Sequence, residues 1–166
     1  EGGSLYTRIP GNRNAAAAYV AVTEKGILRL KLKAIGKAGH ASVPPKHTAI
    51  GILAEAVCRI ENSPMKKRLH PVVRDFCKAI APAMPFYFRL LTANLPVTKP
   101  LLIRALCKNE KQRALLSTTM PFTMCSGGVA TNILPASAEA EMNVRLLHGD
   151  TPETVLAHLK ALTADL

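Results

Sequence analysis

The stretch Ile27-Leu-Arg-Leu-Lys-Leu-Lys-Ala-Ile35 alternates through its middle and decides the fold class. Its even-numbered positions, Leu28 to Ala34, are all apolar, whereas Arg29, Lys31 and Lys33 are basic. A period of two places successive side chains on opposite faces of a strand. The pattern therefore predicts a β-strand with one buried face and one basic, solvated face.

A second stretch, 138–146, has the same period and the complementary charge. Its even positions are apolar, and Glu139 and Glu141 lie on the other face, followed by Asn143 and Arg145. Opposite charges on neighbouring antiparallel strands stabilise each other by a few tenths of a kcal/mol per pair. We therefore expect these two strands to be adjacent.

A third strand is expected around Ser117 to Cys125, with Met120, Phe122 and Met124 on one face. Pro121 lies within it and cannot donate a ladder hydrogen bond, which predicts a position at the sheet edge. The short apolar run 16–23 is either a further strand or a hinge.

Two helices are indicated by apolar residues at helical spacing, one from about Thr48 to Ile60 and one from Pro152 to Ala164. Thr151 is a favourable N-cap, and proline suits the first helical position. The order strand, helix, insert, strand, strand, helix is that of an α+β, ferredoxin-like βαββαβ sandwich without its last strand. In that fold the strand order is 4-1-3-2, which places the proline-bearing strand at an edge.

The insert between the first helix and the strand expected around Ser117 to Cys125, roughly 65–116, is predicted to form two to four short helices. It also holds most of the charge excess behind the net charge of +11: residues 66–113 contain eleven basic and two acidic residues. A solvated surface and an electrostatic guide for carboxylate-bearing substrates both explain this excess. The aromatic residues Phe86, Tyr87 and Phe88 would line an acyl-chain pocket or pack in a core.

Nucleic acid and membrane are not expected as partners. The predicted strands lack the exposed aromatic residues on which RNA-binding sheets stack bases. The longest largely apolar run, 79–88, is much shorter than the roughly 20 residues that cross a bilayer. Four widely spaced cysteines form no metal or redox motif, so we expect reduced thiols. They favour the cytoplasm, although the sequence leaves the compartment open.

Three side chains stand out as candidates for chemistry. His40 lies in the glycine-bearing loop 36–42, Asn132 ends the flexible segment 126–132, and Arg145 lies on the polar face of a strand. Each also has a structural explanation: a histidine satisfied within its loop, an ordinary loop amide and a salt-bridged surface arginine. No local grouping of His, Asp, Glu or Cys makes a complete metal site.

Four segments taken together resemble the lid domain of the aminoacylase and carboxypeptidase S-like zinc metallopeptidases. They are Val22-Thr-Glu-Lys-Gly26, Gly36-Lys-Ala-Gly-His-Ala-Ser-Val-Pro-Pro45, Thr131-Asn-Ile-Leu-Pro135 and Asn143-Val-Arg-Leu-Leu-His-Gly-Asp-Thr-Pro-Glu153. Each is weak alone, but the four occur in register over nearly the whole chain. The Glu1-Gly-Gly3 start is similar to a segment that ends the catalytic domains of that family.

The resemblance implies a role for each candidate. His40 would reach into the active site of the other subunit of a homodimer and bind the scissile carbonyl oxygen. Asn132 and Arg145 would bind the terminal carboxylate of a peptide or N-acyl amino acid. Glu1 matches a metal-ligand position. Two zinc ions would be held by a catalytic domain outside this chain, and none is expected within it.

The same resemblance gives the expected organisation. Residues 1–25 would lead in from the catalytic domain, and residues 26–166 would form the lid, or dimerisation, domain with its helical insert. We expect the chain to be part of a longer hydrolase and inactive by itself. The alternative is a pure dimerisation module in which His40 has only a structural role.

Overall fold

The computed structural model describes residues 3–6 and 16–166, and the chain divides into two compact units. One unit contains residues 26–65 and 118–166 and is built on a sheet. The other contains residues 1–25 and 66–117 and is mainly helical. Glu1 lies outside the described residues.

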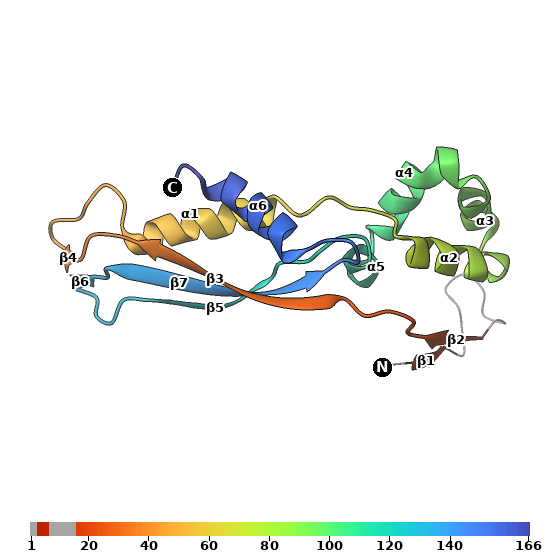
Figure 1. The fold of residues 1–166 in the computed structure, drawn as a ribbon, viewed down its shortest axis with the longest axis horizontal. Helices are drawn as coiled ribbons and strands as arrows, with labels where there is room; N and C mark the ends of the chain where they lie inside the picture. The colour runs from red at the N-terminus through yellow and green to blue at the C-terminus, as the bar shows by residue number, and fades with distance from the viewer. Residues whose placement is uncertain (1–2, 7–15) are drawn as a thin grey trace. The chain divides into compact units, whose positions relative to one another are not determined.

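The first unit is a three-stranded antiparallel sheet with the order β3-β7-β5. Its strands are β3 (Gly26–Ile35), β7 (Ser137–Leu146) and β5 (Phe122–Gly127). Helices α1 (Ala49–Asn62) and α6 (Pro152–Thr163) lie on the same face of the sheet (Figure 1). This arrangement confirms the α+β class, the adjacency of the first two predicted strands and the edge position of the third.

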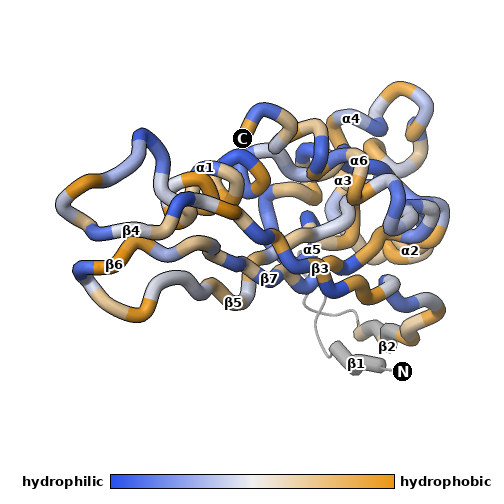
Figure 2. Tube along the Cα trace, turned by 60° about the vertical axis from the view of Figure 1, so that its left-hand side comes forward, coloured by the Kyte–Doolittle hydropathy of each residue, from blue (hydrophilic) through white to orange (hydrophobic). Residues whose placement is uncertain are grey.

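Alternation in the sequence becomes alternation in burial. Along β7, Ala138, Ala140, Met142 and Val144 are buried beneath the helices, whereas the residues between them are partly exposed. The hydropathy of β3 alternates in the same way (Figure 2). On the open face, Lys31 Nζ lies 3.0 Å from Glu139 and 3.2 Å from Glu141. The predicted charge complementarity is therefore present.

One predicted detail of the edge strand is wrong. Phe122 pairs with Met142, but Met124 pairs with Glu141, so the register shifts between them. This β-bulge sends Met124 to the open face, where it is 64% exposed, while Phe122 packs towards the helices. The three apolar side chains Met120, Phe122 and Met124 thus do not share a face.

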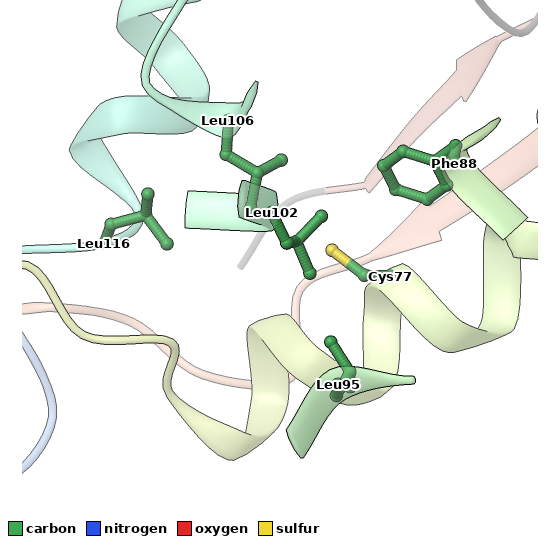
Figure 3. Close-up of a cluster of buried hydrophobic side chains, with 6 residues drawn as sticks. All are labelled: Cys77, Phe88, Leu95, Leu102, Leu106 and Leu116. Atoms are coloured by element: carbon green, nitrogen blue, oxygen red, sulfur yellow. The ribbon is translucent and has the colours of Figure 1, made fainter. Parts of the chain in front are cut away.

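Residues 66–117 of the helical unit, all of which the structure describes, form four α-helices and one 3₁₀ turn, in agreement with the predicted two to four short helices. Its core gathers side chains from three of the helices and from the segment that follows them (Figure 3). A short antiparallel pair, β1 (Gly3–Tyr6) with β2 (Ala17–Val20), belongs to the same unit and shows that the apolar run 16–23 contains a strand. The helical elements are α2 (Pro71–Ile80), η1 (Ala81–Ala83), α3 (Phe86–Ala93), α4 (Leu95–Leu106) and α5 (Glu110–Ala114).

Candidate functional site

His40 and Asn132 meet at one end of the sheet unit, although 92 positions separate them in the sequence. The ladder of β3 and β7 continues beyond Ile35 through a hydrogen bond from Gly36 N to Ala136 O at 2.8 Å. It then becomes the pair β4 (Gly39–His40) and β6 (Ile133–Leu134), in which His40 lies opposite Ile133. Ala41 N donates to Asn132 O at 3.0 Å, so the backbone holds the two candidates side by side. We call residues 36–42 and 130–136 the tip.

Gly36 is required at the base of the tip by a close approach. A Cβ at this position would lie 2.7 Å from Ala49 N and 3.0 Å from Ala49 Cβ, because α1 begins directly against the end of β3. Gly39 is different, since a Cβ there would meet nothing within 4 Å. Of the two glycines, only Gly36 is therefore fixed by packing.

The hydrogen bonds of His40 determine which ring nitrogen is free. Ser42 N donates to His40 Nδ1 at 3.2 Å, and Ser42 Oγ lies 2.7 Å from the same nitrogen. A backbone N–H can only donate, so Nδ1 is the acceptor and the proton of the neutral ring is on Nε2. Because the residue is exposed, Nε2–H is left as a donor that points away from these two partners. Ser42 was not predicted as a site residue, and its only signal in the sequence is a hydroxyl two positions after the histidine.

Arg145 lies at the opposite end of β7 from the tip. It pairs with Ile27 at the beginning of β3 and bridges to Thr119, whose backbone it contacts at 2.9 and 3.1 Å. Arg145 lies eight positions after Ser137 along β7, which at about 3.3 Å per residue corresponds to roughly 26 Å. The tip continues beyond Ser137 (Figure 1). The structure therefore brings His40 and Asn132 together but does not bring Arg145 to them.

Arg145 and Asn143 lie on the open face of the sheet unit. The side chain of Arg145 is exposed, and no carboxylate among the described residues lies within ion-pair distance of it. Next to it, Asn143 Oδ1 is buried and has no hydrogen-bond partner among the residues that the structure describes. A buried amide oxygen without a partner carries a desolvation cost of about 1–3 kcal/mol.

No metal centre is evident in the part of the chain that the structure describes. Within residues 3–6 and 16–166, no three His, Cys, Asp or Glu residues are placed to hold a metal ion. Nor does any helix of those residues have the length and apolar character needed to span a membrane. At the tip, the imidazole of His40 and the side-chain amide of Asn132 can both donate hydrogen bonds.

A family model described as "Peptidase dimerisation domain" matches residues 22–166. The chain belongs to this family. The peptidase dimerisation domain is therefore the identity of most of the chain, including the tip and both helices of the sheet unit. The resemblance inferred from the four sequence segments is confirmed.

Curated relatives cover nearly the whole chain. The Homo sapiens "N-fatty-acyl-amino acid synthase/hydrolase PM20D1" is 35% identical over 166 residues, which is 99% of this chain and 33% of the relative. A "Probable carboxypeptidase S-like 2" of Dictyostelium discoideum is 32% identical over 89% of this chain and 28% of its own length. The chain thus spans about a third of the length of these relatives, which are hydrolases or peptidases by name.

The chain is also similar to a solved structure. That structure is the M20 family metallo-carboxypeptidase Sso-CP2 from Sulfolobus solfataricus, with 21% sequence identity and a TM-score of 0.49. The match covers 85% of this chain and 40% of that chain.

Proposed function

We propose that this peptidase dimerisation domain serves a metal-dependent hydrolase that cleaves peptides or N-acyl amino acids. The observation that carries the proposal is the tip, where backbone pairing holds His40 beside Asn132 and Ser42 leaves the Nε2–H of the histidine free. Residues 26–166 would form the lid, and residues 1–25 would lead in from a catalytic domain. The metal, zinc by resemblance, would be bound outside the described residues and would activate water there.

In this proposal His40 stabilises the oxyanion that forms as the amide carbonyl is attacked. Its Nε2–H donates a hydrogen bond to the carbonyl oxygen. This hydrogen bond becomes stronger as negative charge develops on the oxygen. Ser42 is a positioning residue, because its N–H keeps Nδ1 an acceptor and so keeps the proton on the outward nitrogen. The amide of Asn132 would contact the substrate beside the histidine.

Arg145 would bind the substrate carboxylate, since its planar guanidinium can form two parallel hydrogen bonds with one carboxylate. The length of β7 places Arg145 far from the tip of its own chain. A single substrate of the size of an amino acid cannot contact the tip and Arg145 of the same chain across roughly 26 Å. If all three residues serve one substrate, the tip must come from one subunit and Arg145 from its partner.

A symmetric dimer would supply that arrangement, and two exposed features support it. β5 is a sheet edge whose only described neighbour is β7, and such edges are commonly covered by a partner. The exposed side of α1 carries the small residues Gly51 and Ala54, beside Ile50, which is 46% exposed. We expect Ala54→Arg to dissociate the dimer in sedimentation experiments, and an unchanged dimer would place the interface elsewhere.

The central experiment replaces His40 in the intact protein. Removal of one oxyanion donor lowers turnover by about a hundred- to a thousandfold, so His40→Ala should lower kcat by this factor while metal content and dimerisation are kept. His47→Ala is the matched control, because His47 is an exposed histidine in the same connection to α1. Equal and small effects of both variants would favour the alternative, a dimerisation module without catalytic residues.

A mixed dimer tests the action across the subunits. One subunit carries His40→Ala, and the other has an inactivated catalytic domain of its own. The only competent site then combines an intact catalytic domain with the intact His40 of the partner, so about half of the normal activity should return. If heterodimers form and no activity returns, His40 acts within its own subunit or only supports the tip.

A further inference from the structure

The open face of the sheet unit carries a ladder of opposite charges that is broken at one position. In two successive cross-strand pairs, a lysine of β3 lies opposite a glutamate of β7, and these pairs are Lys33 with Glu139 and Lys31 with Glu141. The next pair on this face is Arg29 with Asn143. Because asparagine has no charge, Arg29 has no acid opposite it on β7.

Both glutamates of this face are already bound by the lysines. Lys31 contacts the two of them, and Lys33 Nζ lies 3.2 Å from Glu139. Glu141 is also a diagonal neighbour of Arg29, yet its ion pair is with Lys31. Among the described residues, no carboxylate lies within ion-pair distance of Arg29. Its guanidinium therefore remains available to a ligand.

Arg29 and Arg145 are neighbours on the same face. Asn143 N donates to Pro121 O on the β5 side, so its pair with Arg29 has no hydrogen bonds between β3 and β7. In pairs of this kind the Cα atoms are about 4.5 Å apart and the side chains lie closest. Arg145 lies two positions further along β7, and diagonal neighbours are about 7–8 Å apart, within reach of long side chains.

The two arginines present hydrogen-bond donors side by side. Both side chains are exposed, and a guanidinium can only donate. The acceptor between them, Asn143 Oδ1, is buried and is bound by neither arginine. Two neighbouring cations repel each other, and a ligand that carries a negative group for each of them relieves this repulsion. This part of the face thus favours a ligand with two carboxylates.

The proposed function already gives Arg145 the terminal carboxylate of the substrate. One carboxylate can occupy the two-pronged donor of one guanidinium, which leaves Arg29 free for another. We propose that Arg29 binds a side-chain carboxylate of the substrate and so gives the hydrolase a preference for a terminal acidic amino acid. Glutamate and aspartate carry their two carboxylates on a short alkyl chain, which suits diagonal neighbours. This inference rests on the proposed role of Arg145.

The test compares N-acetylglutamate with N-acetylglutamine, which have nearly the same size and the same terminal carboxylate. Both are titrated calorimetrically into the intact protein in the presence of a chelator, so that binding is measured without cleavage. The ratio kcat/KM is measured for both with the metal present. Charge-assisted hydrogen bonds to the second carboxylate should favour N-acetylglutamate about tenfold or more in each measurement.

Three variants locate the preference. Arg29→Gln should abolish it and leave the values for N-acetylglutamine close to those of the wild type. Lys33→Gln is the matched control, because it removes the same charge from the same strand and face while Glu139 keeps its contact with Lys31. This control should retain the preference. Arg145→Gln should weaken both ligands, because both carry the terminal carboxylate.

Other results would overturn the inference. Equal losses in Arg29→Gln and Lys33→Gln would mean diffuse electrostatic attraction, and equal losses of both ligands in Arg29→Gln would mean that the two arginines share one carboxylate. A wild type that binds neither ligand, or does not distinguish them, would exclude the second contact. A lower Tm of Arg29→Gln with an unchanged preference would mean that a carboxylate elsewhere in the intact protein pairs with Arg29.

The role of Arg145 is judged separately. If Arg145→Gln cleaves N-acetylglutamine as well as the wild type does, the carboxylate role in the proposed function is refuted. If Arg145→Gln loses both ligands and Arg29→Gln keeps the preference, only the inference about Arg29 fails.

Discussion

Replacement of Gly36 by alanine tests how the tip is anchored to the sheet. The new Cβ would lie 2.7 Å from Ala49 N, whereas ordinary contacts begin at 3.4 Å, so the two elements must separate by about 3.4 − 2.7 = 0.7 Å. The obstacle is backbone at the beginning of α1, and the side chain of Ala49 is fully buried. No flexible side chain can move aside to relieve this contact.

The magnitude follows from two opposing effects. Overpacking in a well-packed region lowers the free energy of unfolding by about 1–3 kcal/mol. Replacing glycine by alanine also reduces the conformational entropy of the unfolded chain, which raises the free energy of unfolding by about 0.4–1 kcal/mol. We expect Gly36→Ala to lower the free energy of unfolding by about 1–2 kcal/mol. Gly39→Ala gains the second effect without the first, because nothing lies within 4 Å of its new Cβ. Gly36→Ala should therefore be less stable than the wild type and Gly39→Ala more stable. The free energies of unfolding of the two variants should differ by about 2 kcal/mol.

Urea unfolding followed by circular dichroism measures this difference, and Tm should separate by about 4–8 °C. Hydrogen exchange at the first turn of α1 should accelerate in Gly36→Ala alone. The reasoning would be refuted if Gly36→Ala were as stable as Gly39→Ala, because the approach of α1 to β3 would then tolerate a side chain.

Three further predictions concern the core, a buried thiol and the open face of the sheet. Leu102→Ala should lower the free energy of unfolding by about 2–5 kcal/mol, because Leu102 is fully buried in the helical unit. Leu101→Ala, at the exposed neighbouring position, should change it by less than about 0.5 kcal/mol in the same denaturant titrations. Burial raises the pKa of Cys77 to about 11, so at pH 8 this thiol should react with a disulfide reagent far more slowly than the exposed thiols, and equal rates would contradict its burial. Hydrogen bonds from Lys31, and then from Lys33, hold the pKa of Glu139 below its ordinary value, so its contribution to stability is present above that value and is lost as the pH falls through the lowered pKa. Lys31→Met should reduce this pH dependence in unfolding curves at low salt, and an identical pH profile would show that the pair contributes nothing.

Much of the sheet unit is predictable because its information is local. The alternation in β3 and β7 specifies which face is buried, and the complementary charges specify the neighbour. The second helix is predictable for the same reason, since Thr151 accepts a hydrogen bond from Thr154 N at 3.4 Å and proline occupies the first helical position. Each of these signals operates within a few residues or between two matched strands.

The candidate site was less accessible to sequence reasoning. His40, Asn132 and Arg145 stand out in the sequence by their positions, but only the resemblance gives them roles, and two features of their placement come from the structure. Ser42 holds the Nδ1 side of His40, and the length of β7 keeps Arg145 away from the tip. Neither follows from residue types alone, because the first depends on the backbone geometry between positions 40 and 42 and the second on how far β7 extends.

By itself, the sequence determined the three longer strands and both helices of the sheet unit, the buried faces of β3 and β7, and the family to which the chain belongs. Tertiary structure decided the rest. The bulge between Phe122 and Met124 turns one methionine to the open face, because a one-residue shift in register reverses every later side chain. The pairing of β4 with β6 joins His40 to Asn132, and the turn of α3 separates Phe86 from Phe88. These outcomes depend on which distant backbone a segment meets, and periodicity within a segment carries no information about that choice.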